Sequence, residues 1–310
     1  MSVAAVMLPL ADSSFGALSL GPDPWAVTLD PFQLVPILLI GLLYARRART
    51  LAGRGRPVEA RRKLAFYSGL GVLVLALASP IDSIGEERLL SIHMVQHILI
   101  GDIAALLLVL GVTGPLLRPV LALPVIGRLR ALAHPFVALP LWAVNLYVWH
   151  LPAAYGAALS NNLVHAAQHT CFLLAGSFMW AALVEPLPGP AWFGSGFKAL
   201  YVVVVRVIEA GLANIFIWSS RPFYPHYVDA PRFHGISVMA DQNTGGAILL
   251  LEGSLLTFGV LAMLFLRWLN ESERTELLVA QGVDPRTARR AVRYGRAESF
   301  GEGPQGPEPA

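Results

Sequence analysis

The stretch LLSIHMVQHILIGDIAALLLVLG, residues 89–111, decides the fold, because it is long and apolar enough to cross a lipid bilayer as one helix. A hydrocarbon core about 30 Å thick takes about 20 helical residues, and Asp102 is the one carboxylate in this stretch. Further apolar runs cover residues 31–47, 64–80, 133–150, 162–184, 199–219 and 244–268. The sequence therefore predicts an all-α fold, a polytopic membrane helical bundle of about seven transmembrane helices.

The number of spans is less certain than the fold class. The first and fourth runs are short and contain Pro36 and Pro140, which leaves six, seven or eight spans open. The composition agrees with a membrane protein: 55% of the 310 residues are hydrophobic, 14% are charged, and the mean hydropathy is +0.58.

The positive charges predict the orientation. With the N-terminus outside, the cytoplasmic segments hold 19 of the 23 Lys and Arg residues, and Arg206 lies within a span. We therefore expect a multi-pass membrane protein with a cytoplasmic C-terminus. The net charge of +3 follows from this bias, and no nucleic-acid-binding module is visible to explain it otherwise.

The chain divides into three predicted regions. Residues 1–30 are expected to form an outer N-terminal tail, residues 31–268 the seven-helix domain, and residues 269–310 a cytoplasmic tail that is partly disordered. The basic segment at the start of that tail could lie on the membrane as a short helix. The single cysteine, Cys171, excludes an intramolecular disulfide and a CxxC metal site.

The histidines gather on the predicted outer side. HMVQH carries His93 and His97 at the start of the third span, HAAQH carries His165 and His169 at the start of the fifth, and His150 closes the fourth. Residues four apart share one face of a helix, so both pairs can point into one small volume. Imidazole suits Zn, Cu, Fe and Ni. Ionisable groups inside membrane spans are costly to bury, so their presence there points to a function. We predict a metal site, most simply copper, although a single pair equally fits an interhelical hydrogen bond.

Four further residues are candidates for the site or its support. Met94 could add a thioether, which suits Cu(I). Asp241 and Gln242 lie at the outer mouth of the seventh span, where Asp241 could orient a ligating histidine or cap the helix. Asp102 lies one turn deeper than His97 and needs a partner, and Arg206 is expected to pair with a glutamate three residues on.

Haem is the alternative cofactor. One haem iron takes its two axial histidines from opposite faces of the ring, and two histidines one turn apart on the same helical face cannot supply both. His226 and His234 fit solvated loop positions better than ligand positions.

Several motifs together resemble the caa3-type cytochrome c oxidase assembly factor family. They are DPWAVTLDPF (23–32), SIHMVQHILIGD (91–102), WHLPAAYGAALSNNLVHAAQHTCFLLAGSFMW (149–180), RPFYPHYV (221–228) and DQNTGG (241–246). The resemblance covers nearly all of residues 25–268. The matched positions are His93, Met94, Gln96, His97, Trp149, His150, Pro152, His165, His169, Asp241, Gln242, Gly245 and Gly246. The loop with His234 and Met239 departs from the family pattern.

The resemblance implies a role in maturing haem-copper oxidases, with oxidase subunits and a periplasmic copper donor as partners. A membrane cytochrome and a copper transporter remain the competing functions. Because no Ser or Cys nucleophile stands with a base and an orienting residue, we do not expect an enzyme.

Overall fold

The computed structural model describes residues 25, 27, 29–124, 128, 130–231 and 234–293. Within these ranges the chain forms helices and short connections and no strand, which confirms the all-α prediction. Most of the predicted 1–30 tail, Arg232 and residues 294–310 lie outside the described residues. The apolar helices fit a multi-pass membrane protein.

The helices of the first half form three long rods with short helices at their ends. These are α1 (Pro31–Ala52), α2 (Ala60–Ala78), α3 (Pro80–Glu87), α4 (Leu90–Ile98), the π-helical segment η1 (Leu99–Ala104), α5 (Ala105–Gly111) and α6 (Gly114–Leu121). Helix α4, η1 and α5 run on as one continuous rod, Leu90–Gly111.

The second half contains the longest helices. In chain order, the elements of this half are η2 (Arg130–Ala133), α8 (Pro135–His150), α9 (Pro152–Ser160), α10 (Asn162–Val184), α11 (Ser195–Trp218), α12 (Pro225–Asp229), α13 (Val238–Ala280) and α14 (Pro285–Arg293). Helices α11 and α13 pack along each other, and α10 packs against α8, η1 and α5.

The prediction of seven spans is not confirmed, although six spans, which the sequence also left open, stay possible. Among the described residues, four helices are long and apolar enough to cross a membrane: Leu90–Gly111, Asn162–Val184, Ser195–Trp218 and Val238–Ala280. The count rises to six if α2 with α3 and α8 with α9 each form one bent span. Pro80 and Pro152 stand at the first positions of the second helix in each pair, because proline starts a new helix more readily than it continues one.

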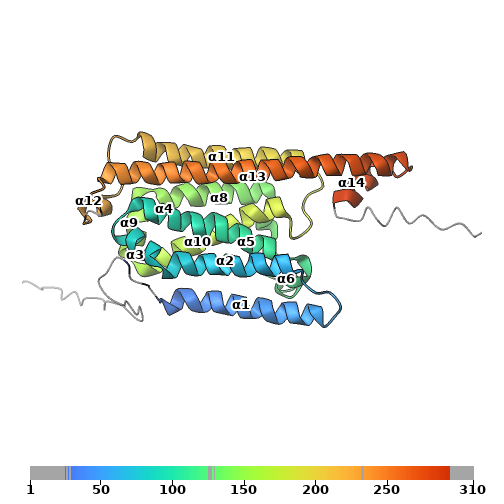
Figure 1. Cartoon of the computed structure of the whole chain (residues 1–310), viewed down its shortest axis with the longest axis horizontal. Coiled ribbons are helices and arrows are strands. Elements are labelled where there is room, and N and C mark those ends of the chain that lie inside the picture. Colours follow the sequence, from blue (N-terminus) through green and yellow to red (C-terminus); the bar gives the residue numbers. More distant parts are fainter. Residues whose placement is uncertain are drawn as a thin grey trace, which may run out of the picture.

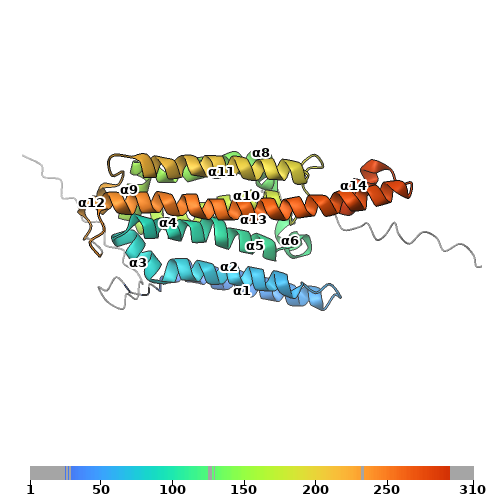
Figure 2. The same ribbon diagram turned by 45° about the horizontal axis from the view of Figure 1, so that its top comes forward.

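The long helices lie side by side, and the short ones gather at the ends of the bundle (Figure 1). We call the end that carries α3, α9 and α12 the histidine end; α6 lies at the opposite end in both views (Figure 2). Helix α13 continues beyond the bundle to Ala280. It therefore passes position 268, after which the cytoplasmic tail was predicted to begin. Helix α14 then packs back on it through Ala288 and Ala291 against Leu278.

Side-chain caps fix where several helices begin. Asp30 accepts a hydrogen bond from the Phe32 N–H at the start of α1, and Asn161 accepts from Leu163 and Val164 at the start of α10. Ser237 caps α13, so neither Asp241 nor Asn243 is the cap of that helix. Each cap satisfies backbone donors that a helix leaves unpaired at its first turn.

Glycines let helices approach closely beside the site. A Cβ at Gly176 would overlap the backbone oxygen of Gly101, so α10 lies directly against η1. A Cβ at Gly246 would lie 2.7 Å from the Ala213 oxygen of α11, and one at Gly245 3.3 Å from Met94. Gly245 and Gly246 therefore allow α13 to approach α4 and α11 closely.

Candidate metal centre

Four of the predicted histidines meet at the histidine end. His93 and His97 come from α4, and His165 and His169 come from α10. One ring nitrogen from each lies within 4.8 Å of one ring nitrogen of every other. Their exposed fractions are 5% or less. These four residues are called the histidine cluster below; their role as metal ligands stays a prediction.

The ring of His93 is oriented by Tyr227. The Tyr227 hydroxyl donates to the Gly85 carbonyl at 2.7 Å and lies 3.1 Å from His93 Nδ1. Burial raises the pKa of Tyr227, so the hydroxyl keeps its single hydrogen, which goes to Gly85. His93 Nδ1 therefore donates to the Tyr227 oxygen, and His93 Nε2 carries the lone pair that faces the cluster.

His165 is oriented in the same way by a carboxylate. Its Nδ1 lies 2.7 Å from an oxygen of Glu86 in α3, and a carboxylate only accepts. The Nε2 of His165 thus carries a lone pair, and it has no hydrogen-bond partner among the described residues. A histidine whose second nitrogen is held by a carboxylate or a carbonyl is the usual arrangement of a metal ligand.

The other two members of the histidine cluster have spare nitrogens. His97 Nε2 lies 2.8 Å from His93 Nε2, while His97 Nδ1 has no partner in the described part of the chain. Neither nitrogen of His169 has one. Buried polar atoms normally have partners, so these nitrogens are the ones that could hold a bound ion.

His150 lies beside the histidine cluster. Its Nδ1 is 2.7 Å from the Leu146 carbonyl, which leaves the lone pair on Nε2. The centre of its ring is 5.8 Å from that of His97, and it is 7% exposed. His150 therefore offers a fifth imidazole close to the cluster.

Asp241 supports the site through the backbone. Its carboxylate accepts from the N–H groups of Leu90 and Ser91, at 2.7 and 3.0 Å. It therefore caps α4, the helix that carries His93, and among the described residues no hydrogen bond joins it to a histidine ring. The negative charge also suits the positive end of the α4 dipole. Met94, fully buried, packs toward Gly245 of α13.

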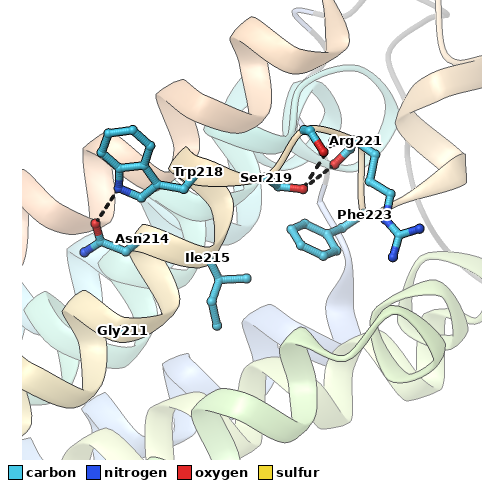
Figure 3. Close-up of a pocket in the computed structure, with 8 residues that line it drawn as sticks. Gly211, Asn214, Ile215, Trp218, Ser219, Arg221 and Phe223 are labelled. Atoms are coloured by element: carbon cyan, nitrogen blue, oxygen red, sulfur yellow. Dashed lines mark hydrogen bonds between the residues drawn. The ribbon is translucent and has the colours of Figure 1, made fainter.

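Gln242 holds the loop that follows α11. Its carbonyl accepts from the Phe223 N–H at 2.9 Å, and its amide donates to the oxygens of Phe216 and Arg221. This loop borders a surface hollow of about 550 Å³, where the Trp218 indole donates to Asn214 and the Ser219 hydroxyl bonds to the Arg221 backbone (Figure 3). Its lining contains no histidine, so the hollow is separate from the histidine cluster.

Asp102 lies apart from the histidine cluster. It belongs to η1 and meets Glu209 of α11 and Glu252 of α13, with carboxylate oxygens within 4.8 Å of one another. The predicted pair between Arg206 and Glu209 is confirmed at 3.2 Å. We call Asp102, Glu209 and Glu252 the carboxyl cluster.

The remaining outer histidines are exposed. His226 Nε2 lies 2.8 Å from the Glu86 backbone oxygen, and His234 has a left-handed backbone with φ of 49°. Met239 lies in the first turn of α13. His226 thus contacts the same residue whose carboxylate holds His165.

Three residues at these clusters did not emerge from the sequence. Glu86 and Tyr227 act across the fold, on histidines far from them in the chain. Glu252 had a readable signal, a lone glutamate inside the apolar run AILLLEGSLL, because an acidic residue within a span is a functional candidate by default.

Relatives of this chain are found among mycobacterial proteins that carry the name uncharacterised protein. The proteins from Mycobacterium bovis and Mycobacterium tuberculosis are each 26% identical over 260 residues, which cover 77% of this chain and 38% of theirs. One from Mycobacterium leprae is 24% identical over 259 residues. This chain thus spans about 38% of the length of those two proteins.

No solved structure matches the chain. The model of the cytochrome c oxidase caa3 assembly factor family, however, matches residues 42–271. This range includes the histidine cluster, His150, Asp241 and the carboxyl cluster, and it covers well over half of the sequence. The chain belongs to the cytochrome c oxidase caa3 assembly factor family.

Proposed function

We propose that the histidine cluster binds a copper ion as cargo and supplies it to a haem-copper oxidase during assembly. The observation that carries the proposal is the convergence of four buried imidazoles, with nitrogens within 4.8 Å of one another. For His93 and His165, a hydrogen bond on the second nitrogen sets the lone pair toward the cluster. Such hydrogen bonds orient the ring of a ligating histidine before the metal ion binds.

The charge of the site favours Cu(I) over a divalent ion. Its donors are neutral imidazoles, and the cost of burying an ion in a medium of low dielectric rises with the square of its charge. Imidazole suits copper in either oxidation state, and copper stands above zinc in affinity for nitrogen sites. His150, with its unpaired Nε2 beside His97, would serve as the place to which the ion shifts before transfer.

The geometry speaks against haem at the same site. A porphyrin inserted between any two of these nitrogens would overlap the other two, since all four lie within 4.8 Å. The transporter alternative requires nitrogen or sulfur ligands further inward. The next ionisable group along the same rod is Asp102, which meets carboxylates instead.

The partners follow from the family and from the predicted orientation. We propose that the histidine end faces the outer side of the bacterial inner membrane, where a periplasmic donor delivers copper and an oxidase subunit receives it. The protein acts by binding and release and catalyses no reaction of its own.

Metal binding by the detergent-purified protein tests the proposal. Wild type, a His93/His97/His165/His169 quadruple alanine variant and a His134→Ala control, which alters a histidine at the opposite end, are loaded with Cu(I) without oxygen and challenged with a Cu(I)-selective chelator. We expect one retained copper per chain in wild type and control, none in the quadruple variant, and no Soret band. Equal copper retention in wild type and quadruple variant would refute the site.

A further inference from the structure

Four arginines line one hollow at the end of the bundle opposite to the histidine end, where α6 lies (Figure 2). The hollow has a volume of about 730 Å³ and lies between the end of α1, helix α6 and the segment that follows α10. Its charged lining residues are Arg47, Arg54, Arg56 and Arg118, and none of the residues that line it is acidic. We call it the arginine hollow.

The charge of the arginine hollow is not balanced within the described part of the chain. A second hollow, of about 460 Å³, shows the usual arrangement: Arg267, which lines it, pairs with Glu271 at 2.6 Å, and Arg293 pairs with Glu185. No ion pair of this kind joins an arginine of the arginine hollow to a described carboxylate. Because four like charges around one space repel one another, an anion bound there is favourable.

The turn after α1 fixes two of these arginines. Gly55 has a φ of 71°, in the left-handed region that glycine adopts at little cost. The backbone N–H groups of Arg54 and Arg56 both donate to the Leu51 carbonyl, at 3.1 and 2.9 Å. The turn is therefore held on the end of the helix with both side chains at the arginine hollow, and binding an anion requires little further ordering of the backbone.

Arg47 connects the arginine hollow to α6. Its Nη2 donates to the Pro115 carbonyl in the first turn of α6, at 2.8 Å. Its Nε is buried and has no partner among the described residues. A guanidinium group presents its N–H donors in a plane that matches two oxygens of a phosphate group. The arginine hollow thus offers an unpaired N–H on a side chain that is already held in place.

Apolar residues share the lining with the arginines: Leu51, Leu121, Ala122 and Leu187. On the same face of α1, Leu43 lies one turn before Arg47 and is 64% exposed, and Leu39 lies one turn further and is 52% exposed. Helix α1 ends beside α6 (Figure 1), so these leucines lead from the arginine hollow toward the middle of the bundle. A free phosphate ion would leave this surface bare, whereas the acyl chain of a lipid would cover it.

We propose that the arginine hollow binds an anionic phospholipid, with the phosphate group on the arginines and the acyl chains along the exposed leucines of α1. Basic pockets between helices on the cytoplasmic side of a membrane are typical headgroup sites, and the charge bias predicts that this end is cytoplasmic. The lipid holds α1 against α6. The inference goes beyond copper binding at the histidine cluster and does not rest on it.

Native mass spectrometry of the detergent-purified full-length protein tests the inference, because it counts the lipids bound to each chain. The added probes are cardiolipin, phosphatidylglycerol and phosphatidylcholine, whose choline cancels the charge of its phosphate. We expect one tightly bound anionic lipid per chain and at least about 10-fold weaker binding of phosphatidylcholine. Inorganic phosphate in large excess should not displace the lipid, because it cannot cover the apolar surface.

A triple variant removes most of the charge without disturbing the contact between α1 and α6. Arg54→Gln/Arg56→Gln/Arg118→Gln alters three exposed side chains and keeps the bond from Arg47 to Pro115. It should bind cardiolipin at least about 10-fold more weakly than wild type does.

The matched control removes the same charge elsewhere. Arg286→Gln/Arg289→Gln/Arg290→Gln alters three exposed arginines of α14, none of which lines the arginine hollow, and should bind cardiolipin as wild type does. Equal affinity of wild type for cardiolipin and phosphatidylcholine would overturn the inference, as would an equal loss in both triple variants or no loss in either. Displacement of cardiolipin by inorganic phosphate would assign the hollow to a free anion and would equally overturn it. If the first variant does not fold, the wild type still decides the matter, because cardiolipin must raise its Tm more than phosphatidylcholine does.

Discussion

The histidine cluster and the carboxyl cluster both include residues of the continuous rod of α4, η1 and α5, yet one consists of imidazole groups and the other of carboxyl groups. His93 and His97 present nitrogen atoms near one end of the bundle, whereas Asp102 meets two further carboxyl groups at its middle. One helix thus contributes to two clusters of different chemistry.

The two clusters also differ in how they are held. The histidines are oriented by partners near the histidine end, including Glu86 and Tyr227, whereas in the carboxyl cluster Glu209 is held by Arg206. Changes at one cluster should therefore leave the other intact, except at the joint between them. The predictions below test that separation.

The largest expected effect is the loss of a ligand. His97→Ala removes a nitrogen from the centre of the histidine cluster and should weaken Cu(I) binding by more than about 100-fold, whereas His150→Ala should weaken it by less than about 10-fold. Competition with a Cu(I) chelator measures both. Equal losses would place His150 among the permanent ligands and would contradict the arrangement described.

Removing the partner of a ligand should cost less. Glu86→Leu deletes the acceptor that orients His165 and should weaken Cu(I) binding by about 10- to 100-fold. Glu86→Gln keeps an acceptor oxygen and should recover most of the affinity. Glu87→Leu, at the exposed neighbouring position, is the control, and an equal loss there would show that the Glu86 contact does not matter.

The contact between α10 and η1 is the next most sensitive point. Gly176→Ala places a methyl group against the Gly101 backbone and should destabilise the protein by about 1–3 kcal/mol, the usual cost of overpacking. Thermal unfolding in detergent measures it, and Cu(I) binding should weaken. Gly71→Ala, in α2 with no atom within 4 Å, should be neutral or slightly stabilising. A Gly176→Ala protein as stable as Gly71→Ala would contradict the close contact.

The smallest expected effect concerns an exposed carboxylate. The Thr287 N–H donates to Asp284 at the start of α14, and this bond lowers the pKa of Asp284 below its ordinary value of 3.8. The carboxylate therefore stabilises α14 above about pH 4, and this contribution is lost as the pH falls through the lowered pKa. Hydrogen exchange of Pro285–Arg293 should speed up in acid, beyond the intrinsic pH effect, in wild type. It should change less in Asp284→Asn, and identical profiles would contradict the cap.

The sequence predicts the class of fold and the main members of the site, because both depend on local patterns. Apolar runs predict spans whatever their neighbours are, and the four-residue spacing in HMVQH and HAAQH places each pair on one helical face. The motifs also indicated the family that the comparison of residues 42–271 shows.

What the sequence could not predict depends on contacts across the fold. Asp241 was predicted either to orient a histidine or to cap its own helix, but it caps α4, which only the packing of α13 against α4 determines. Asp102 was grouped with the histidines because a regular helix places it one turn deeper, whereas it lies in η1 and meets Glu209 and Glu252. The bends at Pro80 and Pro152 similarly divide two candidate spans into pairs of shorter helices, so fewer spans consist of a single helix.

Helix α13 joins these regions mechanically. Its 43 residues extend about 65 Å at 1.5 Å per residue, and no proline interrupts them. Near one end of α13, the Asp241 carboxylate accepts a hydrogen bond from the backbone of α4. Near the other end, beyond the bundle, Leu278 packs against α14. A rod of this length is a lever arm: a tilt of about 5° at the projecting end displaces the other end by about 5 Å. Force applied where α14 docks would therefore reach the helix that carries His93 without direct contact.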